Sequence, residues 1–140
     1  MGLGKTVQTV SLLAAVFRKT GERDIDEEAN KSKRRGLPLL EGEERRRPCL
    51  IVFPASVLEN WRRELETWGY FVTESLGAAE ESRATVRRAG EGRLDVVLAS
   101  YEKMAMYAAE LAGVAWEAVV FDEGHRLNRA AKGEYKAALR

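Results

Sequence analysis

The residues best suited to chemistry lie at the start of the chain, in the sequence Met-Gly-Leu-Gly-Lys-Thr. Gly2 and Gly4 allow the backbone to turn tightly and to bring main-chain N–H groups against phosphate oxygens. Lys5 would place its charge between β- and γ-phosphates, and the hydroxyl of Thr6 would coordinate Mg²⁺. The pattern is the second half of a phosphate-binding loop, because the full spacing G-x-x-x-x-G-K-[ST] begins before residue 1. For this stretch alone, a glycine-rich terminus with a chance Gly-Lys-Thr explains the residues equally well.

A second group of reactive side chains follows the apolar run 118–121 near the other end of the chain. Asp122 would hold the Mg²⁺ shell opposite Thr6, and Glu123 would orient or deprotonate an attacking water. His125, the single histidine of the chain, comes directly after these carboxylates. For the acidic pair alone, a solvated turn or a helix start is a competing explanation. The two half-motifs in this order together favour a nucleotide site.

The composition is that of one globular domain. The chain has 140 residues, of which 45% are hydrophobic and 32% charged, and its formal net charge is +1. No general positive field therefore attracts nucleic acid, so a surface that binds it would have to be local. Cys49 is the only cysteine and is expected to be buried rather than reactive. We see no signal peptide and no apolar run long enough for a bilayer, and therefore expect an intracellular protein without a membrane partner.

The hydrophobic pattern predicts helices and strands in alternation. The expected helices are 6–18, 56–68, 78–89 and 101–112, and the expected strands are 49–53, 70–76, 94–100 and 116–121. Ser56 and Glu59 have the spacing of a capping box at the start of the second helix. This alternation predicts an α/β fold with a parallel sheet that is covered on both faces. The carboxyl ends of its strands would then lie at one edge, where ligands bind in such folds.

Two tryptophans share one face of the predicted helix 56–68. Leu58, Trp61, Leu65 and Trp68 recur at helical spacing. Their spacing along one stripe predicts core residues, with no need for a role in stacking on bases.

The segment 22–48 differs from the rest of the chain. Acidic and basic blocks alternate within it, and only the short run Leu-Pro-Leu-Leu offers apolar surface. We expect a disordered, mobile surface insertion. Its basic blocks could touch DNA phosphates, but the acidic blocks of matching size oppose a strong effect.

Beyond these residues, the sequence resembles a known family over nearly its whole length. MGLGKTVQTVSLLA is similar to motif I of the SWI/SNF-type, helicase-like DNA-dependent ATPases, and LIVFPASVLENWRRELETW is similar to motif Ia. VVLASYEKM resembles the strand that ends in a Thr/Ser-Tyr-Glu element, and VVFDEGHRLNR resembles motif II, the DExH box. The chain is thus identified as the first RecA-like lobe of such an ATPase, a helicase ATP-binding domain of the P-loop NTPase class. TWGYFVT and the long insertion resemble the Cockayne-syndrome-B-like branch of excision repair.

The resemblance implies a function and a set of site residues. It implies binding of ATP and Mg²⁺ between two lobes, and hydrolysis coupled to translocation along double-stranded DNA, in chromatin remodelling or DNA repair in the nucleus. The residues that would bind the nucleotide are Gly2, Leu3, Gly4, Lys5 and Thr6. Thr6 and Asp122 would hold the metal, and Lys5, Asp122, Glu123 and His125 would form the catalytic set. His125 would couple hydrolysis to DNA contact, and Ser56 and Asn60 are candidate DNA contacts of motif Ia.

Departures from the family pattern lower the activity that we expect from these 140 residues alone. The strand before MGLGKT and the second RecA-like lobe with its arginine fingers are expected to be missing, which would leave a partial lobe over 1–140. Arginine fingers contribute about 10³–10⁵ in rate, so we expect weak nucleotide binding and negligible hydrolysis. Asn128 and Arg129 also depart from the usual His-Arg-Leu-Lys-Asn, with little expected effect. The alternatives are a non-catalytic fragment that binds DNA or protein, and an unstable product of an incomplete gene model.

Overall fold

The structure is a computed structural model, and it describes residues 3–17, 19–20, 22–36, 46–68 and 70–122. The helical elements are α1 (Leu3–Val16), α2 (Arg23–Arg35), the 3-10 turn η1 (Ala55–Val57), α3 (Leu58–Trp68), α4 (Ala79–Gly90), α5 (Tyr101–Met106) and α6 (Ala108–Ala112). The strands are β1 (Cys49–Phe53), β2 (Thr73–Ser75), β3 (Val96–Ser100) and β4 (Ala118–Phe121).

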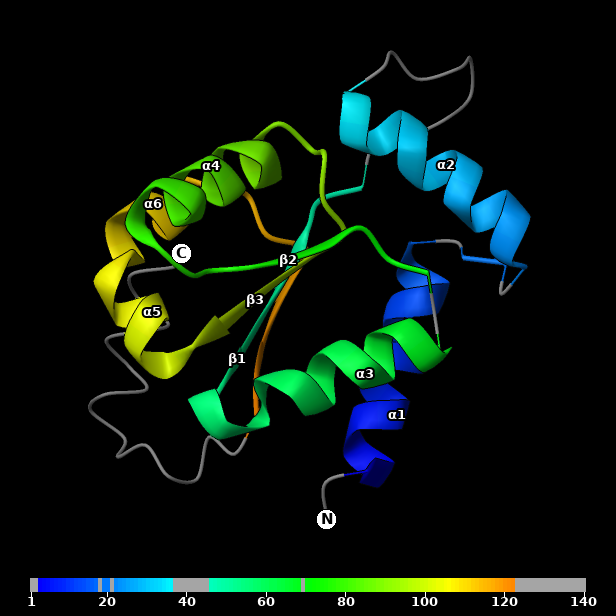
Figure 1. Cartoon of the computed structure of the whole chain (residues 1–140), viewed down its shortest axis with the longest axis horizontal. Helices are drawn as coiled ribbons and strands as arrows, with labels where there is room; N and C mark the ends of the chain where they lie inside the picture. The colour runs from blue at the N-terminus through cyan, green and yellow to red at the C-terminus, as the bar shows by residue number, and fades with distance from the viewer. Residues whose placement is uncertain (1–2, 18, 21, 37–45, 69, 123–140) are drawn as a thin grey trace.

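These strands form a parallel sheet in the order β2-β3-β1-β4. Helices α1 and α3 cover one face of the sheet, and α4, α5 and α6 cover the other (Figure 1). The central strand β1 is buried along its whole length because its side chains pack against the helices on both faces of the sheet. Cys49, Ile51 and Phe53 pack with α1 and α3, whereas Leu50 and Val52 pack toward α4, α5 and α6. The prediction of a three-layer α/β fold of the RecA-like kind is therefore confirmed.

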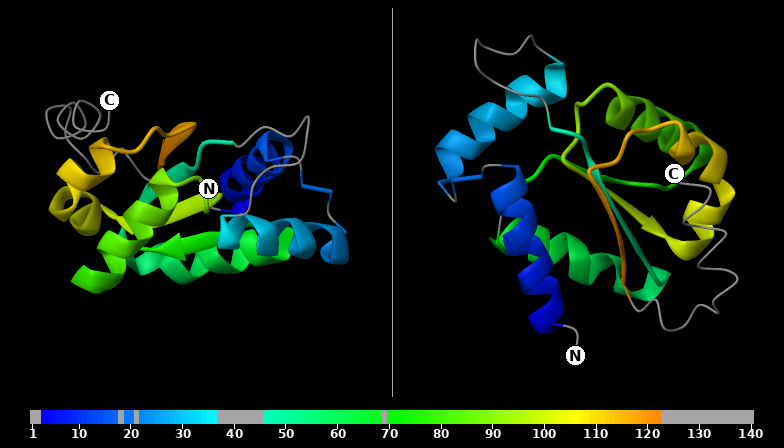
Figure 2. Two further views of the ribbon diagram at one scale, coloured as in Figure 1. Left: turned by 90° about the horizontal axis from the view of Figure 1, so that it is seen from above. Right: turned by 180° about the vertical axis from the view of Figure 1, so that it is seen from behind.

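Helix α2 differs from the irregular structure that the sequence predicts over 22–48. It places Asp24 and Asp26 in its first turn and three basic residues in its last turn, so its charges complement the helix dipole. Gly36 ends the helix with φ 64°, a left-handed conformation that favours glycine. The helix packs beside the amino end of β3, as the views in Figure 2 also show. The remainder of that segment, 37–45, lies outside the described residues.

Three other elements differ from the sequence pattern in their bounds. The predicted helix 101–112 is divided at Tyr107, which leaves the helical region with φ −111° and ψ 24°. The break lets Met104 on α5 and Leu111 on α6 both reach the same core. The predicted strand 70–76 is reduced to Thr73–Ser75. The N–H of Val72 donates to the side chain of Asp95, the residue before β3, and not to a carbonyl of the neighbouring strand. Helix α3 begins after η1, and the predicted cap residue Glu59 pairs with Arg62 at 2.8 Å.

Among the helices in the described part of the chain, none combines the length and apolar character that crossing a membrane requires.

Candidate functional site

The carboxyl ends of β1 and β4 lie side by side and position the candidate site. Val52 is paired with Phe121 in the register of the two strands. The N–H of Asp122 extends this pairing by donating to the carbonyl of Val52 at 2.7 Å. The start of α1 lies at the same end of the molecule, as Figures 1 and 2 both show. The sequence predicts that the carboxyl ends of the strands lie at one edge, and the parallel pairing of β1 and β4 agrees with this.

Asp122 is also held by hydrogen bonds from α3 and α5. Its side chain accepts a hydrogen bond at Oδ2 from Nε1 of Trp61, on α3, at 3.0 Å. Its carbonyl accepts from the hydroxyl of Tyr101, at the start of α5, at 2.7 Å. The ring of Tyr101 also stacks on Phe121, with centroids 6.5 Å apart. These contacts leave Asp122 half-buried, and Oδ1 accepts no hydrogen bond from the described residues.

The donor set at this edge fits Mg²⁺ bound together with a nucleotide. Within the described ranges, no cluster of three metal-ligating side chains forms a protein cage. Mg²⁺ in phosphate sites keeps several waters and takes one or two carboxylates together with phosphate oxygens. Such a site needs one accessible carboxylate from the protein, and Asp122 is half-buried with no hydrogen bond to Oδ1 from the described residues.

The first turn of α1 contains the candidate nucleotide-binding residues Leu3, Gly4, Lys5 and Thr6. The sequence predicts a loop here and a helix from Thr6, whereas the helix of the structure begins at Leu3. Leucine and lysine are good helix formers and one glycine costs only about 1 kcal/mol, so a helical turn is accessible to this sequence. The helix axis then directs its positive end to the same edge as Asp122. Gly2 lies outside the described residues.

The remaining predicted site residues are divided between the surface and the undescribed part of the chain. Ser56 in η1 and Asn60 in α3 are exposed, and both follow the carboxyl end of β1. They therefore lie at the same edge of the sheet as Asp122. Glu123 and His125 lie outside the described residues.

The sequence predicts that Trp61 is a core residue, and it gives Tyr101 no role beyond the start of a helix. Trp61 is 3% exposed, so the prediction of a core residue is confirmed; the side chain of Trp68 lies outside what the structure describes. A buried indole N–H needs an acceptor, and this need was the available signal for a functional contact. The acceptor could not be read from the sequence, because it depends on which strand lies next to β1.

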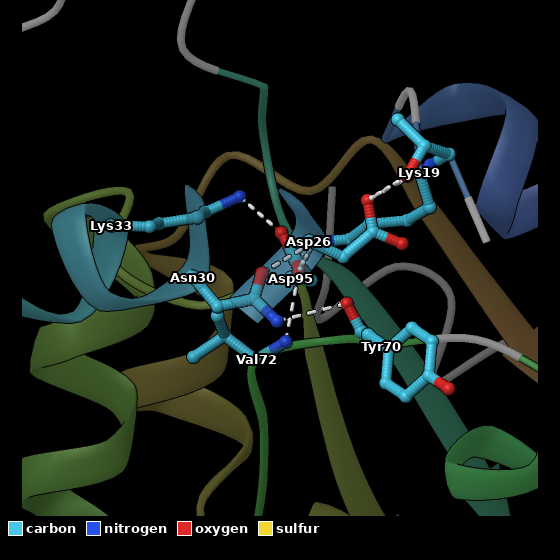
Figure 3. A network of polar contacts seen from close by, with 8 residues as sticks. Lys19, Asp26, Asn30, Lys33, Tyr70, Val72 and Asp95 are labelled. Atoms are coloured by element: carbon cyan, nitrogen blue, oxygen red, sulfur yellow. Dashed lines mark hydrogen bonds and ion pairs between the residues drawn. The ribbon is translucent and has the colours of Figure 1, made fainter. Parts of the chain in front are cut away.

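A second polar cluster lies at the opposite, amino-terminal edge of the sheet (Figure 3). Asp95, which is 1% exposed, pairs with Lys19 at 2.8 Å and with Lys33 of α2. Its Oδ2 also accepts from the N–H of Val72 at 2.8 Å. Asn30 of α2 accepts from Lys19 and donates to the carbonyl of residue 70. The cluster fastens α2 to the sheet, far along the strands from Asp122.

Comparison with known proteins gives a consistent result over the whole chain. Residues 1–140 match the family described as the SNF2-related domain. The chain is 36% identical over 128 residues to DNA excision repair protein ERCC-6-like 2 of Mus musculus, covering 91% of this chain and 8% of that protein. It is 33% identical over 132 residues to Transcription regulatory protein SNF2 of Saccharomyces cerevisiae, covering 93% and 6%. It is 35% identical over 130 residues to ISWI chromatin-remodeling complex ATPase ISW2 of the same yeast, covering 91% and 10%. The chain thus spans between 6% and 10% of the length of these relatives.

Proposed function

Because the chain belongs to the SNF2-related domain family, we propose that it is the ATP-binding lobe of a DNA-dependent ATPase. The observation that carries this proposal is the placement of Asp122. It follows the edge strand β4, which pairs in parallel with the buried strand β1, at the edge toward which the start of α1 points. In parallel α/β sheets, ligands bind outside the carboxyl ends of the strands.

Each motif residue then has a role in the proposed reaction. The main chain of Gly2, Leu3 and Gly4 would face the phosphates, and Lys5 would contact them as a point charge. Thr6 and Asp122 would hold the metal from opposite sides. When bound, Mg²⁺ supplies charge neutralisation at the β- and γ-phosphate oxygens.

The residues after the metal ligand would act on water and on coupling. Glu123 would orient or deprotonate the attacking water, since a carboxylate within hydrogen-bond reach can serve as general base. His125 would couple hydrolysis to DNA contact. For these 140 residues alone, we expect nucleotide binding with negligible turnover.

The DNA side of the proposal rests on η1 and the start of α3. Ser56 and Asn60 are exposed there and can donate hydrogen bonds to phosphate oxygens. Contacts to phosphate are independent of base sequence, which suits a motor that travels along double-stranded DNA. The names of the relatives refer to excision repair, transcription regulation and chromatin remodelling, and they support a nuclear protein that acts on DNA or chromatin.

Nucleotide binding tests the proposal most directly. We expect titration calorimetry of the 140-residue chain with ATP and MgCl₂ to detect binding that Lys5→Ala weakens about tenfold or more. The reason is that a hydrogen bond to a charged group contributes about 1.5–3 kcal/mol. Lys31→Ala is the matched control, because Lys31 is an exposed lysine on α2 that pairs weakly with Glu28, at 3.8 Å. Equal affinity of the wild type and Lys5→Ala would overturn the assignment.

A further inference from the structure

The hydrogen bond between Trp61 and Asp122 joins the hydrophobic core to the candidate metal site. Trp61 Nε1 donates to Oδ2 of Asp122 at 3.0 Å across 61 residues of sequence. The indole belongs to α3 and the carboxylate follows β4, so the contact bridges a helix and the edge strand of the sheet.

The indole is the fixed partner of this pair. Trp61 is 3% exposed and belongs to the core cluster that also contains Leu65, Phe53 and Val10. A side chain enclosed on this scale has one accessible rotamer, because interiors are packed as densely as organic crystals. The N–H therefore marks a fixed point in space, 3.0 Å from the carboxylate oxygen.

The carboxylate is the movable partner, and its main chain is already held on both sides. The N–H of Asp122 donates to Val52, and its carbonyl accepts from Tyr101. The remaining freedom of Asp122 is rotation of its side chain, and the hydrogen bond from Trp61 restricts that rotation. With Oδ2 occupied, the carboxylate presents Oδ1, which accepts no hydrogen bond from any residue that the structure describes.

We propose that Trp61 is a positioning residue that holds Oδ2 of Asp122 so that Oδ1 is directed to Mg²⁺. The inference rests on the proposed function, since it assigns the metal to the same edge. Partners that orient a ligating side chain in this way typically change metal affinity about 10–100-fold when they are removed. A purely structural role for the indole would instead affect folding and leave the metal dependence of nucleotide binding unchanged.

Trp116 provides the matched control. Its indole Nε1 also donates a hydrogen bond, at 2.9 Å, but to the main-chain carbonyl of Leu111. Trp116→Phe and Trp61→Phe therefore remove the same chemical group from a tryptophan that packs against the core. Only the second exchange removes a contact to Asp122.

The first measurement is the affinity of the full 140-residue chain for the β,γ-imido analogue of ATP, in MgCl₂ and in EDTA. The ratio of the affinity in MgCl₂ to the affinity in EDTA measures the gain from Mg²⁺. We expect Trp61→Phe to lower this ratio about tenfold and to leave the affinity in EDTA unchanged. Trp116→Phe should change neither value. In an Asp122→Asn background, Trp61→Phe should cause no further loss, because the two exchanges interrupt one interaction.

The second measurement does not require Trp61→Phe to fold. In ¹H–¹⁵N spectra of the wild type, the indole signals can be assigned through Trp68→Phe and Trp116→Phe, which leaves that of Trp61. We expect this signal to shift on Asp122→Asn, and to respond to the analogue with MgCl₂ in the wild type only. The signal of Trp116 should stay in place throughout.

The outcomes separate this inference from the function on which it rests. If Lys5→Ala binds nucleotide as well as the wild type, both proposals are wrong. If binding depends on Lys5 but the Mg²⁺ gain survives Trp61→Phe, only the positioning role is wrong. An indole signal of Trp61 that ignores Asp122→Asn would also overturn it.

Discussion

At the scale of single residues, the buried side chain of Asp95 interacts with three groups from different parts of the chain. It is 1% exposed. Its carboxylate forms ion pairs with Lys19 and Lys33 and accepts a hydrogen bond from the N–H of Val72. Its own main chain joins β1 to the residue before β2, because its carbonyl accepts from the N–H of Cys49 and its N–H donates to the carbonyl of Val72. One residue thus satisfies charges and main-chain groups from four segments of the chain.

Removing the carboxylate of Asp95 should destabilise the fold strongly. Asp95→Ala leaves Lys19, whose side chain is only 7% exposed, without its carboxylate partner, and the neutral amide oxygen of Asn30 cannot replace that charge. Breaking a buried ion pair from one side costs about 3–5 kcal/mol, a large part of the roughly 5–15 kcal/mol that keeps a domain folded. Urea unfolding followed by circular dichroism measures the loss.

The control for Asp95→Ala is Glu27→Gln on α2. Glu27 pairs with Arg23 at 2.9 Å on the exposed side of the helix, where solvent screens the interaction. We expect no measurable change for this variant. Equal stability of the two variants would show that the Asp95 cluster is not a structural anchor.

The sequence was informative about single residues wherever chemistry or burial follows from residue type. It placed Asp122 after a strand and Trp61 in the core, and the structure agrees on both. It missed the partners Tyr101 and Asp95, whose roles depend on strand order and register. A hydrogen bond across 61 residues, such as that from Trp61 to Asp122, cannot be read from local pattern.

At the scale of elements, Glu74 connects the edge strand β2 to helix α4. Its carboxylate accepts from Arg88 at 2.8 Å and from Thr85 at 3.0 Å. Burial acts to raise the pKa of Glu74, but the hydrogen bonds from Arg88 and Thr85 outweigh it and lower the pKa below its ordinary value. The charged form is therefore favoured by folding.

This lowered pKa predicts a pH-dependent contribution to stability. A depressed carboxyl pKa stabilises the fold fully above the unfolded value of about 4.3, and the contribution is lost as pH falls through the folded pKa. Glu74→Gln should therefore be less stable than the wild type at pH 7, and the difference should shrink below about pH 4. Urea unfolding at several pH values measures it.

An Arg88→Gln background provides the test of cause for Glu74. Because the two residues form one pair, Glu74→Gln should add little there, and the pH dependence of the difference should largely disappear. A difference that keeps its full pH dependence without Arg88 would assign the effect to another group.

Element prediction succeeded where the apolar pattern was strong and failed where charge dominates. The parallel strands and α3 follow from apolar runs and a one-sided stripe, and the structure confirms them. Helix α2 has no apolar stripe of that kind, and it is held by the buried Asn30 and the half-buried Lys33 instead. Hydrophobic periodicity cannot report a helix that docks through such contacts.

At the scale of the molecule, the sheet separates two polar sites at its opposite edges. Asp95 and α2 lie at the amino ends of the strands, and Asp122, η1 and the start of α1 lie at the carboxyl ends. The core between them contains β1, whose residues are buried on both faces. Opening the amino-terminal edge should therefore expose the centre of the sheet.

Cys49 reports on such opening, because it begins β1 and is 1% exposed. Burial raises the pKa of its thiol to about 11, so little thiolate is present at pH 8 in the folded state. We expect a thiol reagent such as DTNB to label the native chain only through unfolding, at a rate that rises with urea in parallel with the loss of structure. Asp95→Ala should accelerate labelling by about two to four orders of magnitude, which corresponds to 3–5 kcal/mol at 1.4 kcal/mol per tenfold. Fast labelling of the wild type that does not depend on urea would show that Cys49 is reached without unfolding, and that the two edges of the sheet open independently.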